Sequence, residues 1–230
     1  MLLFQLFKIL LTDPVQFIVA LIILIVPLLI SITVHEWAHG FTAYKFGDPT
    51  PARQGRLSFN PFAHLDPIGT LMLFIIGIGW AKPVEINPNN INKKYKLMLV
   101  ALAGPLSNFI LAIFFTFILY FLIKISITGP FLENNGLFYL TIILLKLIIK
   151  INFILGIFNL LPIPPLDGAN VISNLMPDKM AENYFKIAPY SLPILFLLII
   201  SGGIKFIFIF TEILLNTLII FIDYFLGNLF

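Results

Sequence analysis

The chain is dominated by long apolar runs that are separated by short polar segments. Uncharged apolar runs cover residues 15–34, 97–123 and 187–200. Run 206–222 is equally apolar apart from Glu212, and 137–161 is equally apolar apart from two lysines. Most of these runs reach or approach the ~20 residues that an α-helix needs to cross a bilayer. The run 187–200 is short and is followed by Ser201, Gly202 and Gly203, so residues 187–222 form either two helices or one interrupted helix. We therefore predict an all-α polytopic membrane helix bundle of five or six spans.

Segment 47–96, after the first span, has a different pattern. It is rich in Pro, Gly and Asn and contains an apolar run of only twelve residues, 68–79. A helix of that length rises about 18 Å, which is too short to cross a bilayer. Irregular backbone at membrane depth is tolerated only where protein or a water-filled cavity satisfies its polar groups. We expect 68–79 to be re-entrant or interfacial, and 47–96 to form a wall or lid of a cavity.

Composition supports a membrane protein. Apolar residues make up 60% of the chain and charged residues 11%, against about 45–50% and 25% in soluble domains. No basic stripe with interleaved aromatic residues is present, which argues against a nucleic-acid partner. We expect residues 1–230 to form a single membrane-embedded domain without an appended regulatory domain.

The basic residues indicate an orientation. Seven of the 14 lysines and arginines lie in 45–96, and the positive-inside rule then places this segment in the cytoplasm. We expect a multi-pass protein of the bacterial cell (inner) membrane. Lys146 and Lys150 fall within a predicted span, four residues apart, where they either snorkel to the interface or line a cavity.

The end of the first span carries an H-E-x-x-H motif, His35-Glu36-Trp37-Ala38-His39. On a helix, His35 and His39 point the same way and can bind one Zn²⁺, while Glu36 lies where it can take a proton from the attacking water. A charge at mid-membrane costs about 2.5–3.5 kcal/mol on insertion scales, whereas zinc binding contributes an apparent 10–16 kcal/mol. Metal binding therefore explains this polarity better than anchoring of a helix end.

A catalytic zinc normally has three protein ligands and one open position, and one such zinc per chain would suffice. Asp167 is the candidate third ligand, because it follows three prolines that interrupt a membrane helix in Asn159-Leu-Leu-Pro-Ile-Pro-Pro-Leu-Asp167-Gly168. A structural interpretation, which is compatible with zinc binding, is that Asp167 caps the helix that begins near Ala169. The other candidate third ligands are Glu133, Glu182 and Glu212.

The H-E-W-A-H motif, followed by N-L-L-P-I-P-P-L-D-G, resembles the site-2 protease family of intramembrane metalloproteases. Further matches are Gly104–Asn108, Phe59–Pro61, His64–Pro67 and Gly79–Val84, so that the resemblance covers about residues 30–175. It implies that His35, His39 and Asp167 bind zinc and that Glu36 is the general base. It also implies that Asn159 orients the substrate or stabilises the oxyanion.

Two further polar residues have open roles. Asn108, four residues after Gly104, either makes an interhelical hydrogen bond or contacts substrate. His64 is a structural loop histidine, a fourth ligand or an active-site neighbour.

The function predicted from the sequence is an intramembrane zinc metalloprotease that hydrolyses membrane-spanning substrate segments, with its active site open to the cytoplasmic side. Its partners would be membrane proteins with transmembrane helices and the lipid bilayer. The alternatives are a membrane zincin with a glutamate ligand, of the prenyl-protein or quality-control protease type, and a non-enzymatic zinc transporter. A transporter needs metal-binding residues along a path, whereas those of this chain cluster, which favours catalysis.

Overall fold

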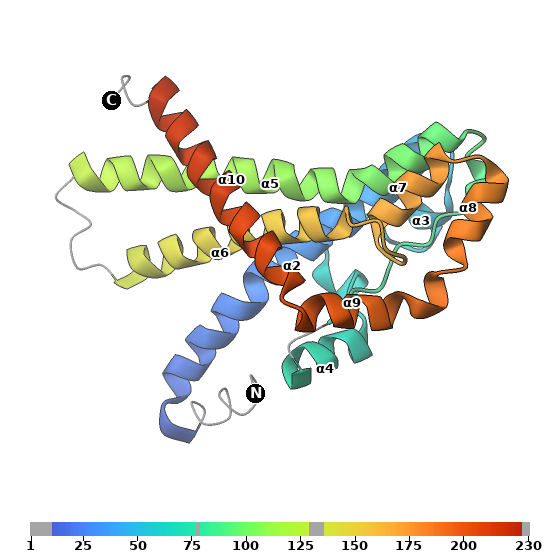
Figure 1. Cartoon of the computed structure of the whole chain (residues 1–230). Helices are drawn as coiled ribbons and strands as arrows, with labels where there is room; N and C mark the ends of the chain where they lie inside the picture. Colours follow the sequence, from blue (N-terminus) through green and yellow to red (C-terminus); the bar gives the residue numbers. More distant parts are fainter. Residues whose placement is uncertain (1–10, 77–78, 129–135, 227–230) are drawn as a thin grey trace.

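The structure, a computed structural model, describes residues 11–76, 79–128 and 136–226, and is built from α-helices (Figure 1). Four helices are long: α2 (Pro14–Lys45), α5 (Lys94–Thr128), α6 (Gly136–Asn159) and α10 (Gly203–Leu226). The short helices are α3 (Thr50–Arg53), α4 (Pro67–Ile76), α7 (Asp167–Leu175), α8 (Asp178–Phe185) and α9 (Ser191–Ile200), with 3₁₀ turns at Pro61–Ala63, Pro88–Asn90 and Ala188–Tyr190. The described residues contain no β-strand, only an isolated bridge between Leu65 and Ala81.

Within the described residues, five helical segments are long and apolar enough to cross a membrane. They are Pro14–Lys45, Lys94–Ser126, Gly136–Asn159, Asp178–Ile200 and Lys205–Phe225. The prediction of an all-α polytopic bundle is confirmed. The C-terminal region consists of two helices, because the chain turns between α9 and α10 at Gly202, whose φ of +81° favours glycine.

Helices α2, α5 and α6 pack against one another, and α10 crosses α5 and α6 (Figure 1). The apolar core between α5, α6 and α10 contains the buried side chains of Ala112, Leu119, Leu145, Ile149, Phe153 and Leu215. Lys150 Nζ lies 2.5 Å from Glu212 Oε1, so this lysine of α6 pairs with a carboxylate of α10. Lys146, on the same helix, is exposed.

Segment 47–96 is held in place by buried polar side chains. Asp48 is fully buried and accepts hydrogen bonds from the backbone N–H of Thr50 and Asn87 and from the side chains of Thr50 and Asn90, at 2.6 to 3.1 Å. Within this segment α4 has ten residues and is about 15 Å long, which is too short to span a bilayer. Its length is the one expected of a re-entrant or interfacial helix.

Arg56 ties the two halves of segment 47–96 together. Its guanidinium is buried and donates to the carbonyl of Ala63, to that of Lys82 at 3.0 Å and to that of Pro83 at 2.7 Å. A buried guanidinium requires such partners, since an unpaired charge would be costly. These bonds fix the extended strip that begins at Gly79.

Candidate metal centre

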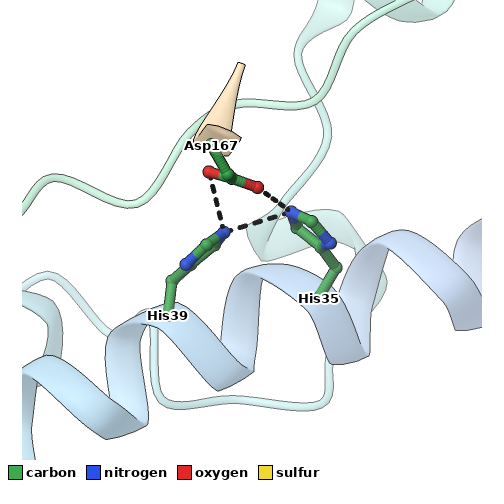
Figure 2. A group of neighbouring side chains, drawn as sticks. All are labelled: His35, His39 and Asp167. Atoms are coloured by element: carbon green, nitrogen blue, oxygen red, sulfur yellow. Dashed lines mark hydrogen bonds and ion pairs between the residues drawn. The ribbon is translucent and has the colours of Figure 1, made fainter. Parts of the chain in front are cut away.

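The imidazoles of His35 and His39 meet the carboxylate of Asp167 on one side of α2 (Figure 2). His35 Nε2 lies 3.1 Å from Asp167 Oδ2, and His39 Nε2 lies 3.3 Å from Asp167 Oδ1. The two Nε2 atoms are 3.1 Å apart. In the described part of the chain, this is the group of His, Asp and Glu side chains that converges closely enough to hold a metal ion.

Hydrogen bonds at the far side of each ring set the tautomers. His39 Nδ1 lies 2.7 Å from the carbonyl oxygen of Val100, which can only accept, so Nδ1 carries the proton and Nε2 keeps its lone pair. His35 Nδ1 lies 2.5 Å from Asn108 Oδ1. An N–H that donates to a carbonyl or amide oxygen is the usual partner arrangement of a metal-binding histidine.

The residues present fit a zinc ion. With both Nδ1 atoms protonated, two Nε2 lone pairs converge with two carboxylate oxygens, and the buried Asp167 Oδ2 has no hydrogen-bond donor. Gly104 of α5 leaves room beside them, because a Cβ there would lie 2.2 Å from His39 Nε2 and 2.6 Å from His35 Nε2. Two imidazoles and one carboxylate are a donor set of catalytic zinc sites, which keep a further position open.

The turn after α6 places Asp167. Helix α6 ends at Asn159, and residues 160–166, with three prolines, form turns before α7 begins. Gly168 packs directly on this turn, since a Cβ there would lie 2.2 Å from the Leu160 carbonyl oxygen. The N-cap of α7 is Leu166, without a side-chain cap. Asp167 is therefore the first residue of α7 and points its carboxylate at the histidines, so the capping interpretation is wrong.

Glu36 lies beside the metal group but outside it. Its Oε2 accepts the backbone N–H of Val84 at 3.0 Å. Glu36, His35, His39 and Asp167 all line one cavity of about 1680 Å³. The carboxylate thus faces the same space as the candidate ligands.

This cavity is mostly apolar and is lined by segments far apart in the sequence. Helices α2, α4, α7 and α9 and the strip from Gly79 contribute to its wall, with apolar side chains such as Leu73, Trp80, Phe158 and Phe196. The cavity is large enough for several residues of a peptide.

The other candidate residues are distributed differently. Asn159 lines the cavity, and its Nδ2 donates to the Leu155 carbonyl at 3.0 Å. Asn108 is fully buried behind His35 and does not line the cavity, so it makes the interhelical hydrogen bond. His64 is also fully buried, with Nε2 2.8 Å from the Ser58 carbonyl, and is not part of the metal group.

The alternative third ligands are not brought to the histidines. Glu212 pairs with Lys150, and neither Glu212 nor Glu182 belongs to the metal group. Glu133 lies outside the described residues.

Sequence reasoning missed four groups that surround the centre. Two are backbone groups, the N–H of Val84 and the carbonyl of Val100, which no side-chain pattern reveals. The other two are Ser31 and Asn152, which are buried beside Asn108. Ser31 and Asn152 are polar residues inside apolar spans, and this feature of the sequence could have indicated that they make buried hydrogen bonds.

Comparison with known proteins gives concordant results. A family model described as Peptidase family M50 matches residues 23–200. YwhC of Bacillus subtilis (strain 168), named as a proposed zinc metalloprotease, is 42% identical over 158 residues, which are 67% of this chain and 69% of YwhC. No solved structure gives a significant match.

Two mycobacterial proteins named Rip2, also proposed zinc metalloproteases, are more distant. The one from Mycolicibacterium smegmatis is 30% identical over 162 residues, 67% of this chain and 58% of Rip2. That of Mycobacterium tuberculosis (strain H37Rv) is 30% identical over 182 residues, 77% of this chain and 65% of Rip2. The matched part is thus less than two thirds of the length of these two relatives.

Proposed function

Because the chain belongs to peptidase family M50 and is a multi-pass membrane zinc metalloprotease, we propose that it cuts peptide bonds within membrane-spanning segments of other proteins. One observation carries this proposal. His35, His39 and Asp167 converge, with Glu36 beside them, on the wall of an apolar cavity among helices long enough to span a membrane. The site would hold one zinc ion per chain, bound by these two histidines and the aspartate.

Zinc, when bound, would supply Lewis acidity toward the scissile carbonyl and the attacking water. Proton transfer and stabilisation of the developing charge are assigned to side chains of the protein. Glu36 accepts the proton of the water and later delivers it to the leaving amine, since it faces the cavity and is oriented by the N–H of Val84. Asn159 lines the same wall. One N–H of its amide bonds the Leu155 carbonyl, and the other would donate to the oxygen that gains negative charge.

The cavity supports an apolar peptide as substrate. Its wall is largely formed by aliphatic and aromatic side chains, which favour the side chains of a transmembrane segment over charged ones. A helical substrate has its amides hydrogen-bonded and must unwind locally before water attacks. The partners would then be membrane proteins with transmembrane helices, delivered through the bilayer, with the catalytic end of α2 on the cytoplasmic side.

The geometry of the metal group supports the proposed protease better than it supports a zincin with a glutamate ligand or a zinc transporter. A zincin with a glutamate ligand would need Glu182 or Glu212 at the histidines, and Asp167 occupies that position. A zinc transporter would need further ligand groups along a path, and the described residues form one metal group.

The test compares Glu36→Gln with Glu85→Gln in protein purified in detergent and reconstituted with a single-span membrane substrate. Glu85 is exposed, bonds Gln54 and does not line the cavity. We expect Glu36→Gln to slow cleavage about 10²–10⁴-fold while zinc stays near one per chain, and Glu85→Gln to change neither. Normal cleavage by Glu36→Gln would contradict the proposed base. Cleavage of unfolded soluble peptides alone would contradict the intramembrane substrate.

A further inference from the structure

Behind His35, three polar side chains from three helices form a buried network. Ser31 lies on α2, Asn108 on α5 and Asn152 on α6, and each is 0% exposed. Asn108 Nδ2 donates to Asn152 Oδ1 at 2.8 Å and to the Ser31 carbonyl at 3.3 Å. Asn152 Nδ2 donates to Ser31 Oγ and to the Ile148 carbonyl, both at 2.8 Å. Burying two amides is costly unless their groups are paired, and here both amides have partners for donor and acceptor.

Two backbone carbonyls fix the direction of this network. The carbonyl of Ile148 can only accept, so the NH₂ group of Asn152 must face it and Oδ1 must face Asn108. The NH₂ group of Asn108 then lies between Asn152 Oδ1 and the Ser31 carbonyl, both acceptors. Asn108 Oδ1 is left facing His35 Nδ1 at 2.5 Å. An oxygen there accepts a hydrogen bond only from a protonated Nδ1, which leaves Nε2 of His35 with its lone pair.

The same network links two elements of the metal centre. Asn152 is seven residues, about two turns, before Asn159, where α6 ends and the turn to Asp167 begins. Its bonds to Ser31 and Asn108 hold α6 against the helix that carries His35 and His39. His39 does not depend on this network, since its Nδ1 bonds the Val100 carbonyl.

We infer that Asn152, supported by Ser31, is a positioning residue for zinc: it orients the Asn108 amide so that His35 presents Nε2 to the metal. This inference rests on the zinc site of the proposed function but not on proteolysis. Partners behind a metal-binding histidine typically change metal affinity 10–100-fold when removed. Asn152 would act on the metal although it touches neither zinc nor substrate.

The test is zinc affinity, measured by competition with a chromophoric chelator, in detergent-purified Asn152→Leu. Leucine has the same number and branching of side-chain heavy atoms as asparagine and removes all three hydrogen bonds. The matched control is Thr116→Val, because Thr116 is also 0% exposed but bonds only the Ala112 carbonyl of its own helix α5. We expect Asn152→Leu to weaken zinc binding about 10–100-fold and Thr116→Val to leave it unchanged.

A second readout separates ligand orientation from general stability. In the cobalt-substituted protein, the visible absorption of Asn152→Leu should shift toward that of His35→Ala, whereas Thr116→Val should keep the wild-type spectrum. If Asn152→Leu does not accumulate, the inference is tested with Ser31→Ala, which removes only one hydroxyl. We expect this variant to show the same spectral shift to a smaller extent. Wild-type affinity and spectrum in a folded Asn152 or Ser31 variant would overturn the inference. Absence of zinc binding by the wild type would instead contradict the proposed function.

Discussion

The backbone N–H of Val84 donates to Glu36 Oε2 at 3.0 Å, so a residue of segment 47–96 holds the side chain that we propose as general base. Arg56 supports this contact, because it bonds the carbonyls of the two residues before Val84. Segment 47–96 therefore both lines the cavity and orients the proposed general base. Its extended strip contributes to the geometry of Glu36.

We expect Val84→Pro, which removes this N–H, to lower kcat about 10–100-fold with little loss of zinc. The reason is that a hydrogen bond to a charged group contributes about 1.5–3 kcal/mol. Val84→Ala is the control, since it trims the side chain and keeps the N–H. Steady-state cleavage and zinc content are measured for both. An equal loss of kcat in the two variants would show that packing, and not the hydrogen bond, matters.

Gly104→Ala should abolish zinc binding. The new Cβ would lie 2.2 Å from His39 Nε2 and 2.6 Å from His35 Nε2, in the space beside both ligand atoms. Gly136→Ala, also helical, is the control, because nothing lies within 4 Å of a Cβ at that position. The measurement is the zinc content of the two purified variants. A Gly104→Ala protein with full zinc would contradict the metal position that we propose.

Parts of this centre were predictable from the sequence because their chemistry is local. His35 and His39 share a helix face by their spacing, and the prolines before Asp167 predict the end of α6. Both predictions require only the geometry of one helix or one turn. The apolar runs likewise predicted the long helices. Helix α8 was missed, because it is polar and a search for apolar runs does not find it.

The surroundings of the centre were not predictable for a physical reason. Asn152 meets Asn108 and Ser31 across 44 and 121 residues of sequence, and an apolar run does not specify which helices become neighbours. In a span that is apolar on all sides, periodicity gives no buried face. The role of Val84 is carried by its backbone, so its side chain gives no signal.

Asp48 should make stability depend on pH. Burial raises the pKa of Asp48, but hydrogen bonds from Thr50, Asn90 and Asn87 outweigh it and hold the pKa below its ordinary value. A carboxyl whose pKa is lower in the folded state stabilises the fold above its unfolded pKa of about 4. This stabilisation is lost as the pH falls through the folded-state pKa.

The corresponding variant is Asp48→Asn, which places an NH₂ group against N–H donors and should cost about 1–3 kcal/mol at neutral pH. The difference in melting temperature from the wild type should shrink below about pH 4. Asp178→Asn is the control, since that carboxylate is 93% exposed and surface pairs contribute little. A difference that is constant with pH would show that the charge of Asp48 is not involved.

The orientation is testable by labelling, because the chain has no cysteine of its own. In the sequence, Asn89 precedes and Asn134 follows the span Lys94–Ser126, so the single-cysteine variants Asn89→Cys and Asn134→Cys flank it. The positive-inside rule predicts that an impermeant maleimide labels Asn134→Cys in intact cells, and Asn89→Cys only after permeabilisation. The reverse pattern would place the catalytic end of α2 on the external side.

Trp80 should affect substrate entry without affecting the metal. It lines the cavity and is 52% exposed, and it does not belong to the metal group. The backbone of Trp80 packs closely against α4, because a Cβ on Gly69 of that helix would lie 2.2 Å from the Trp80 carbonyl oxygen. The next residue, Ala81, forms an isolated β-bridge with Leu65, just before α4. Under the proposed function, a side chain in this position would contact a substrate that moves through the cavity toward Glu36.

We therefore expect Trp80→Ala to slow cleavage of an intact membrane helix more than cleavage of an unwound soluble peptide, because gating elements act on entry and water exclusion. Zinc content should stay unchanged. Tyr95→Ala is the matched control, since Tyr95 is an aromatic residue of similar exposure, 51%, that does not line the cavity. Equal slowing on both substrates, together with loss of zinc, would mean that Trp80 supports the metal centre. The strip would then act on the chemistry and not on entry.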